Sequence, residues 1–211
     1  GIPIVLFDRK TDSQKYTAFI GADNIEVGKD ICEFDARALH GKGSVLEIKG
    51  LNHSSPAIDL HNGFVQALNK YPNIQLTDTI SGDWTELSGY KCMKKMLAKT
   101  ENCNIVWAQN DRMARGAQRA LTEAGIKGVQ FVGIDALPGK DGGIESVDKG
   151  SLLASYIYPT RGDMVMQLAV DILEKRPFHR DNYLKGALVT KNNAKVLLLQ
   201  NEEIMKQRNK L

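Results

Sequence analysis

The chain has 211 residues, of which 42% are hydrophobic and 25% charged, so it has enough apolar material to form one large domain or two small ones. The formal net charge is only +3, and Lys and Arg are scattered among nearly as many Asp and Glu, which argues against a nucleic-acid-binding surface. No apolar run approaches the roughly 20 residues that a membrane-spanning helix needs.

The amino-terminal part of the chain predicts strands and one helix. Short apolar runs indicate strands at residues 4–7, 16–20 and 45–48. A helix is expected over residues 25–40, because Asp23 or Asn24 can accept hydrogen bonds from its first free amides. Gly41 to Gly43 would end that helix.

From residue 44 onward strands and helices alternate regularly. Further strands are predicted at residues 74–79, 105–108, 129–134 and 152–158. Helices are predicted at residues 56–71, 85–99 and 161–175. An amphipathic segment ended by Gly125 lies between the strands at 105–108 and 129–134. This alternation predicts a parallel sheet with helices on both faces. Residues 187–190 and 195–199 are interpreted as short extended pieces before a charged amphipathic end at residues 202–211.

Polar side chains follow two of these strands at the point where each ends. Asn110 and Asp111 come after the strand at 105–108, and Asp135 ends the strand at 129–134. Open α/β sheets bind ligands at the carboxyl ends of their strands, so these residues are candidate ligand contacts. Asp111 is interpreted as the cap of its own helix.

Motifs for enzymatic chemistry, metals and disulfides are weak. Gly41-Lys42-Gly43-Ser44 lacks phosphate-loop spacing and precedes a strand, so it is interpreted as a helix-ending loop. His53, Ser54 and Asp59 could be imagined as a triad, but they lie too close in sequence and lack a nucleophile elbow. The histidines show no metal-ligand spacing, and the cysteines Cys32, Cys92 and Cys103 are predicted to be buried free thiols. We expect neither metal nor cofactor.

Four stretches together resemble the type I periplasmic sugar-binding proteins, the family of the ribose-binding protein. They are Ile2-Pro3-Ile4-Val5-Leu6-Phe7-Asp8-Arg9, Gly21-Ala22-Asp23-Asn24, Ala108-Gln109-Asn110-Asp111-Arg112-Met113-Ala114-Arg115-Gly116-Ala117 and Val132-Gly133-Ile134-Asp135. The resemblance covers nearly the whole chain in the family's order. It implies an α/β fold of two doubly wound parallel-sheet lobes, with most of the amino-terminal lobe absent from this chain.

The resemblance also implies a division of the chain. Residues 1–22 and 159–185 are expected to be a remnant of the amino-terminal lobe, residues 23–158 the complete carboxyl-terminal lobe, and residues 186–211 the final strands and a membrane-proximal tail. The chain is expected to cross between the lobes near residues 21–24, near 135–138 or 158–160, and near the final strands. The missing amino-terminal segment, or a second copy of the chain, is the expected partner.

Carried over by residue, the resemblance implies a sugar site. Asp8 and Arg9 would hydrogen-bond sugar hydroxyls and ring oxygen, and Trp84 would stack on the apolar face of the sugar ring. Asn110 and Asp135 would bind vicinal hydroxyls. The remaining expected ligand-binding residues are Tyr158, which stands where the family often has a polar amide, and Asn24. One departure is Ile58, which replaces a ligand-contacting arginine of the ribose-binding protein, so the sugar or its pose is expected to differ.

The implied function is non-enzymatic sugar binding between lobes that close on the ligand. The carboxyl-terminal segment resembles that of sensor domains in Bacteroides-type hybrid two-component histidine kinases, which implies a periplasmic location in an inner-membrane receptor, attached through a segment beyond Leu211. A transporter's solute-binding protein and, less favoured, the effector domain of a lactose-type repressor remain alternatives. An α/β enzyme acting on sugars is the alternative from a different class.

Overall fold

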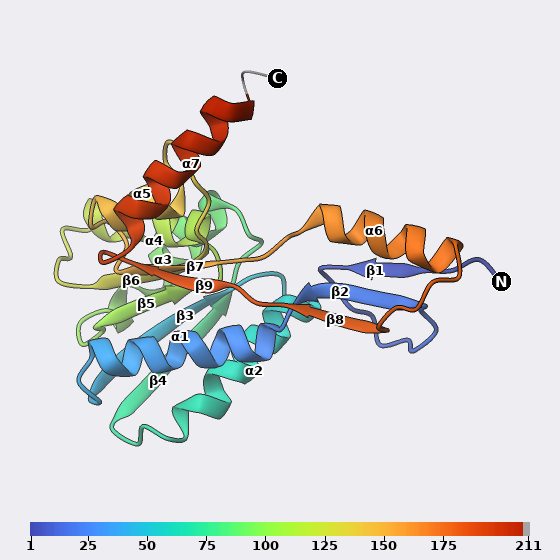
Figure 1. Cartoon of the computed structure of the whole chain (residues 1–211). Helices are drawn as coiled ribbons and strands as arrows, with labels where there is room; N and C mark the ends of the chain where they lie inside the picture. The colour runs from blue at the N-terminus through green and yellow to red at the C-terminus, as the bar shows by residue number, and fades with distance from the viewer. Residues whose placement is uncertain (209–211) are drawn as a thin grey trace.

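The computed structural model describes residues 1–208, which form an α/β chain around two separate sheets (Figure 1). The smaller sheet contains β1 (Val5–Phe7), β2 (Ala18–Ala22) and β8 (Asp181–Leu184) in the order β1-β2-β8, and its strands run parallel. Helix α6 (Gly162–Leu173) packs on this sheet through Leu168, Val165 and Ile172. We call these four elements the small unit.

The larger sheet has six strands and forms the large unit together with the remaining helices. In spatial order the strands are β4 (Ile74–Ser81), β3 (Gly43–Lys49), β5 (Ile105–Ala108), β6 (Gln130–Asp135), β7 (Ala154–Ile157) and β9 (Ala187–Thr190). All neighbours are parallel except β9, which runs antiparallel to β7. The two-sheet α/β fold expected from the sequence is confirmed.

Helices cover both faces of the large sheet. One face carries α1 (Asn24–Ala38) and α2 (Ser55–Leu68), and the other carries α3 (Glu86–Met96) with its 3-10 extension Leu97–Lys99, α4 (Asp111–Glu123), α5 (Gly143–Asp148) and the start of α7 (Ala194–Arg208). Alternate residues of one strand therefore enter different cores: Val45 packs toward α1 and α2, and Leu46 toward α3 and α4. This double burial explains why the strands are continuously apolar.

The strand order reverses at β3, which has β4 on one side and β5 on the other. Such a switch point leaves a crevice at the carboxyl ends of the strands. Three connections, at residues 22–24, 158–161 and 184–187, join the large unit to the small one. The small unit lies beside this carboxyl edge (Figure 1).

The prediction that residues 195–199 are extended is wrong. They lie in α7, where buried Ala194 and half-buried Leu197 and Leu198 have the i, i+3, i+4 spacing of a helix face. A short apolar run does not by itself separate a strand from a buried helix turn. The charged end predicted at residues 202–211 continues in α7 to Arg208, and residues 209–211 lie outside the described part. No helix within residues 1–208 is long and apolar enough to cross a membrane.

Candidate functional site

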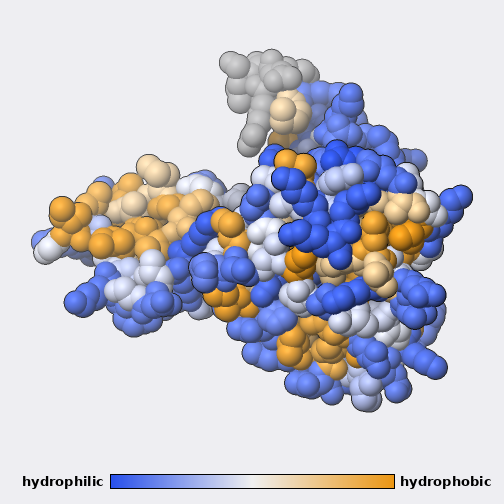
Figure 2. All heavy atoms as spheres, turned by 180° about the vertical axis from the view of Figure 1, so that it is seen from behind, coloured by the Kyte–Doolittle hydropathy of each residue, from blue (hydrophilic) through white to orange (hydrophobic). Residues whose placement is uncertain are grey.

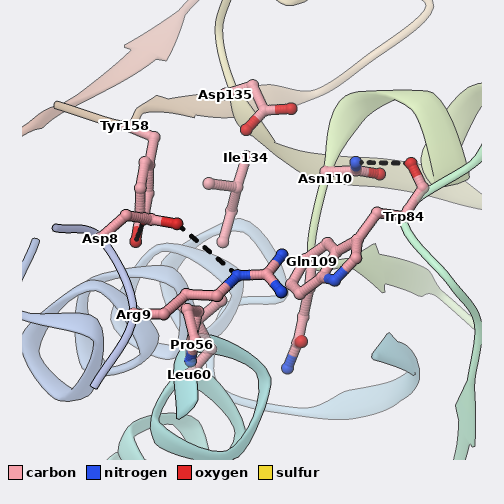
Figure 3. Close-up of a pocket in the computed structure, with 10 residues that line it drawn as sticks. All are labelled: Asp8, Arg9, Pro56, Leu60, Trp84, Gln109, Asn110, Ile134, Asp135 and Tyr158. Atoms are coloured by element: carbon pink, nitrogen blue, oxygen red, sulfur yellow. Dashed lines mark hydrogen bonds and ion pairs between the residues drawn. The ribbon is translucent and has the colours of Figure 1, made fainter. Parts of the chain in front are cut away.

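A cavity of about 190 Å³ opens at the carboxyl edge of the large sheet, where the small unit approaches it (Figure 3). Its lining comes from both units: Asp8, Arg9, Pro56, Leu60, Trp84, Gln109, Asn110, Ile134, Asp135 and Tyr158. Six of the seven expected ligand-binding residues line this cavity, and they come from segments that are far apart in the sequence. The cavity combines apolar walls with a few polar groups, which is the usual composition of a small-molecule site.

The small unit contributes Asp8 and Arg9, which follow β1. The Arg9 Nε lies 3.8 Å from Asp8 Oδ2, and both side chains are partly exposed toward the cavity (Figure 3). The hydroxyl of Tyr158, just after β7, donates to Asp8 Oδ1 at 3.0 Å. Burial and the Asp8 charge raise the pKa of Tyr158, so it remains a neutral donor. The large and small units are therefore joined by a hydrogen bond at the edge of the cavity.

Asn110 caps a helix and also lines the cavity. It is the N-cap of α4, where its Oδ1 accepts from the backbone amide of Met113 at 2.9 Å, while its Nδ2 donates to the carbonyl of Trp84 at 3.0 Å (Figure 3). One N–H of Nδ2 and one lone pair of Oδ1 remain for a ligand. Trp84 presents its half-buried indole to the cavity from the loop after β4.

Asp111 does not cap α4, contrary to the prediction, because Asn110 does. Instead, its Oδ2 accepts from the backbone amide of Ala136 at 2.8 Å and its Oδ1 from the Ser155 hydroxyl at 2.7 Å. Burial raises the pKa of Asp111 to about 7, with the Asp135 charge adding to the shift. Asp111 thus does not line the cavity, and it holds the segment that follows β6.

Asp135 lines the cavity at the end of β6. Burial raises its pKa to about 6, Arg112 opposes that shift and Asp8 adds to it. Its φ is 113°, and Asp8 and Trp84 also have positive φ values, of 66° and 71°. Such conformations are unfavourable for residues with a Cβ and tend to occur at functional sites.

Asn24 is the one expected residue that does not line this cavity. It is 6% exposed at the start of α1 and lines an adjoining cavity of about 70 Å³, together with Asp8 and Asp59. Its Oδ1 is buried and accepts no hydrogen bond. Ile58, at the position of the family's arginine, is 44% exposed and does not line the main cavity, whereas its neighbours Pro56 and Leu60 form an apolar wall there.

Sequence reasoning missed Gln109, Pro56, Leu60 and Ile134 as lining residues. Gln109 could have been found, because it directly follows β5 just as Asn110 does. The three apolar residues gave no such signal, since their patterns are those of ordinary core positions.

The model of the periplasmic binding protein domain family matches residues 1–177, most of the chain. The chain belongs to this family. Among solved structures, the fructose-binding periplasmic domain of the hybrid two-component system BT1754 is 45% identical, with a TM-score of 0.96, over 100% of this chain and 70% of that one.

Two proteins of Escherichia coli K12 are also similar to this periplasmic binding protein domain. The galactofuranose-binding protein YtfQ is 35% identical over 72% of this chain and 48% of that protein. The ribose import binding protein RbsB is 30% identical over 89% of this chain and 59% of that protein. The chain therefore spans about half the length of these curated relatives, both of which are named for binding a sugar.

Within residues 1–208, this periplasmic binding protein domain has no cluster of three or more His, Cys, Asp or Glu side chains that could hold a metal ion. The three cysteines are free and buried, as the sequence predicted. The Ser54 hydroxyl donates to the Leu51 carbonyl at 3.1 Å, so it is engaged with backbone rather than with His53.

Proposed function

We propose that the chain binds a neutral monosaccharide in the cavity between the large and small units, without catalysing a reaction on it. The observation that carries this proposal is the convergence of Asp8, Arg9, Trp84, Asn110 and Asp135 on one cavity. Carboxylate and amide groups supply acceptors and donors for hydroxyls, and the indole supplies a flat apolar surface for the C–H face of a sugar ring. Because its two walls belong to different units, a bound sugar favours the closed arrangement.

Fructose is the first ligand to test, because the 45% identical domain is named for binding it. Isothermal titration of fructose, ribose and methyl galactofuranoside against the purified chain tests the proposal. Binding of at least one sugar is expected. Heat changes no larger than those of dilution for the whole panel would contradict it.

Isosteric variants test the site itself. Asp135→Asn removes a charged acceptor. Asn110→Asp keeps an N-cap for α4 but removes the amide, which donates to the Trp84 carbonyl and has one N–H free for a sugar. Each should weaken binding of the sugar found above by about 1 to 3 kcal/mol, because a desolvated hydroxyl loses its partner. Asp12→Asn, at an exposed position away from the cavity, is the matched control. Wild-type affinity in both cavity variants would place the site elsewhere.

The whole protein is proposed to be a periplasmic sensor of a hybrid two-component system, with a membrane attachment that follows the part described. The similarity to the BT1754 domain supports this role, and the similarity to RbsB supports a transporter's binding protein as the second candidate. The full reading frame of the gene discriminates between them: a membrane span and a kinase indicate a sensor, and a helix-turn-helix segment would indicate a repressor.

A further segment of the protein is proposed to cover the small unit. Figure 2 shows hydrophobic residues gathered on this unit, and α6 exposes 68% of Met166 and 70% of Leu173. Ile4 and Phe7 are also exposed, at 49% and 41%. The coverage of only 70% of the BT1754 domain supports an additional segment of the same protein as the cover, in preference to a second copy of the chain.

A further inference from the structure

Glu47 is a fully buried carboxylate in the middle of β3 and does not line the cavity. Its Oε1 accepts from Gln109 Nε2 at 3.0 Å, and its Oε2 accepts from the Thr79 hydroxyl at 3.2 Å and lies 2.6 Å from His61 Nδ1. Burying a carboxylate is costly unless its oxygens are paired. These four residues form one polar cluster that connects β3, β4, α2 and the residue after β5, with Glu47 and Gln109 buried and Thr79 and His61 partly exposed.

Gln109 links this cluster to the cavity, but its polar atoms are already engaged. Its Nε2 donates to Glu47 and to the Ala57 carbonyl at 3.1 Å, and its Oε1 accepts from the backbone amide of Gly50 at 2.9 Å. Both N–H groups are used, so Gln109 cannot donate to a sugar without losing one of these bonds. Its bonds to the Ala57 carbonyl and the Gly50 amide fix the backbone on both sides of it.

The backbone of Gly50 supports the Trp84 ring. A Cβ built on Gly50 would lie 1.9 Å from Trp84 Cζ2, so the indole rests directly on this glycine. The next residue after Gln109, Asn110, holds the carbonyl of Trp84. Gln109 and Asn110 thus fix the tryptophan at two points, one beneath its ring and one at its backbone.

We infer that Gln109, held in place by Glu47, positions the Trp84 ring for stacking on the sugar through its hydrogen bond to Gly50. Glu47 does not line the cavity, and Gln109 acts here as a positioning residue through its bonds to Glu47 and Gly50. This inference rests on the proposed function, because it assigns the cluster a part in sugar affinity. Pre-set aromatic surfaces lower the entropy cost of binding, so a ring held in place gives tighter binding than a free one.

The test combines Gln109→Met, which keeps the volume but removes the hydrogen bonds, with Trp84→Ala in a double-mutant cycle. Gln109→Met alone should weaken sugar binding about two- to tenfold. In the Trp84→Ala background the same substitution should have no further effect on affinity. Thr79→Val is the matched control, because it removes one bond to Glu47 and leaves the Gln109–Gly50 bond intact; it should leave affinity unchanged.

Tryptophan emission provides a readout that does not need a sugar. In a Trp107→Phe background Trp84 is the remaining indole, and Gln109→Met should shift its emission and increase its quenching by acrylamide in the ligand-free chain. Equal losses of affinity in both Trp84 backgrounds, with unchanged emission, would overturn the inference. If the wild-type chain binds no sugar, the proposed function fails, and the emission measurement still decides whether Gln109 positions the ring.

Discussion

The large and small units differ in how completely their apolar surfaces are covered. The six-stranded sheet has helices on both faces, and Phe64 of α2 stacks on the fully buried Trp107 of β5 with ring centroids 4.5 Å apart. The three-stranded sheet has one helix, α6, of which Leu168 is the one buried residue. A unit whose sheet is covered on both faces buries most of its apolar surface within itself, whereas the small unit leaves much of its apolar surface exposed.

The largest expected effect tests this contrast directly. Phe64→Ala should destabilise the chain by about 3 to 5 kcal/mol, because it removes the stacked partner of Trp107 and leaves a cavity. Leu173→Ala, at a position that is 70% exposed, should cost less than about 0.5 kcal/mol. Urea unfolding of both variants measures the two free energies.

Leu173→Ala also tests the proposed cover of the small unit. If a further segment covers this face, the cost of Leu173→Ala in a protein that includes this segment should rise to about 2 kcal/mol or more, because the leucine would be buried there. An equally large cost in the 211-residue chain, rising with protein concentration, would show that a second copy covers this face instead.

A further expected effect concerns the pH dependence of stability, which differs between the two units. The pKa of Asp111, in the large unit, is about 7 in the folded chain and near 4 when unfolded, so the folded state binds more protons between these values. Asp135, with a pKa of about 6, acts in the same direction. Stability should therefore fall as pH rises from about 4 to 7.

Asp111→Asn should make the fall of the unfolding free energy with pH shallower, because up to about one fewer proton is released when the folded state unfolds over this range. Asp163→Asn in the small unit is the control: the Arg161 guanidinium lowers the pKa of Asp163 to about 2, so its contribution is lost only as pH falls below about 4. Denaturation midpoints at several pH values between 4.5 and 7.5 supply the measurement. A slope unchanged by Asp111→Asn would assign the effect to another buried group, such as Asp35, whose pKa burial also raises well above its usual value.

The sequence predicts those features of the fold and the site that depend on local interactions. The parallel sheet and the Asp23 cap of α1 were predictable, because apolar runs and capping residues act within a few positions. Strand β8 was missed, since Asp181 and Asn182 are poor strand formers and become strand residues only by pairing with β2. The hydrogen bonds of Gln109 to Gly50 and of Tyr158 to Asp8 could not be predicted for the same reason, because they join residues that only the tertiary fold brings together.

The smallest expected effect concerns the bond that joins the two units. Tyr158→Phe removes the hydroxyl that donates to Asp8 Oδ1 and keeps the ring, so Asp8 loses a partner that orients its carboxylate toward the cavity. A net hydrogen bond is worth about 0.5 to 1.5 kcal/mol, and binding of the sugar identified by titration should weaken by that amount. Tyr156→Phe is the matched control, because the Tyr156 hydroxyl bonds to Asp30 within the large unit. It should lower stability slightly and leave affinity unchanged. Equal losses of affinity in both variants would mean that the bond between the units has no separate role in sugar binding.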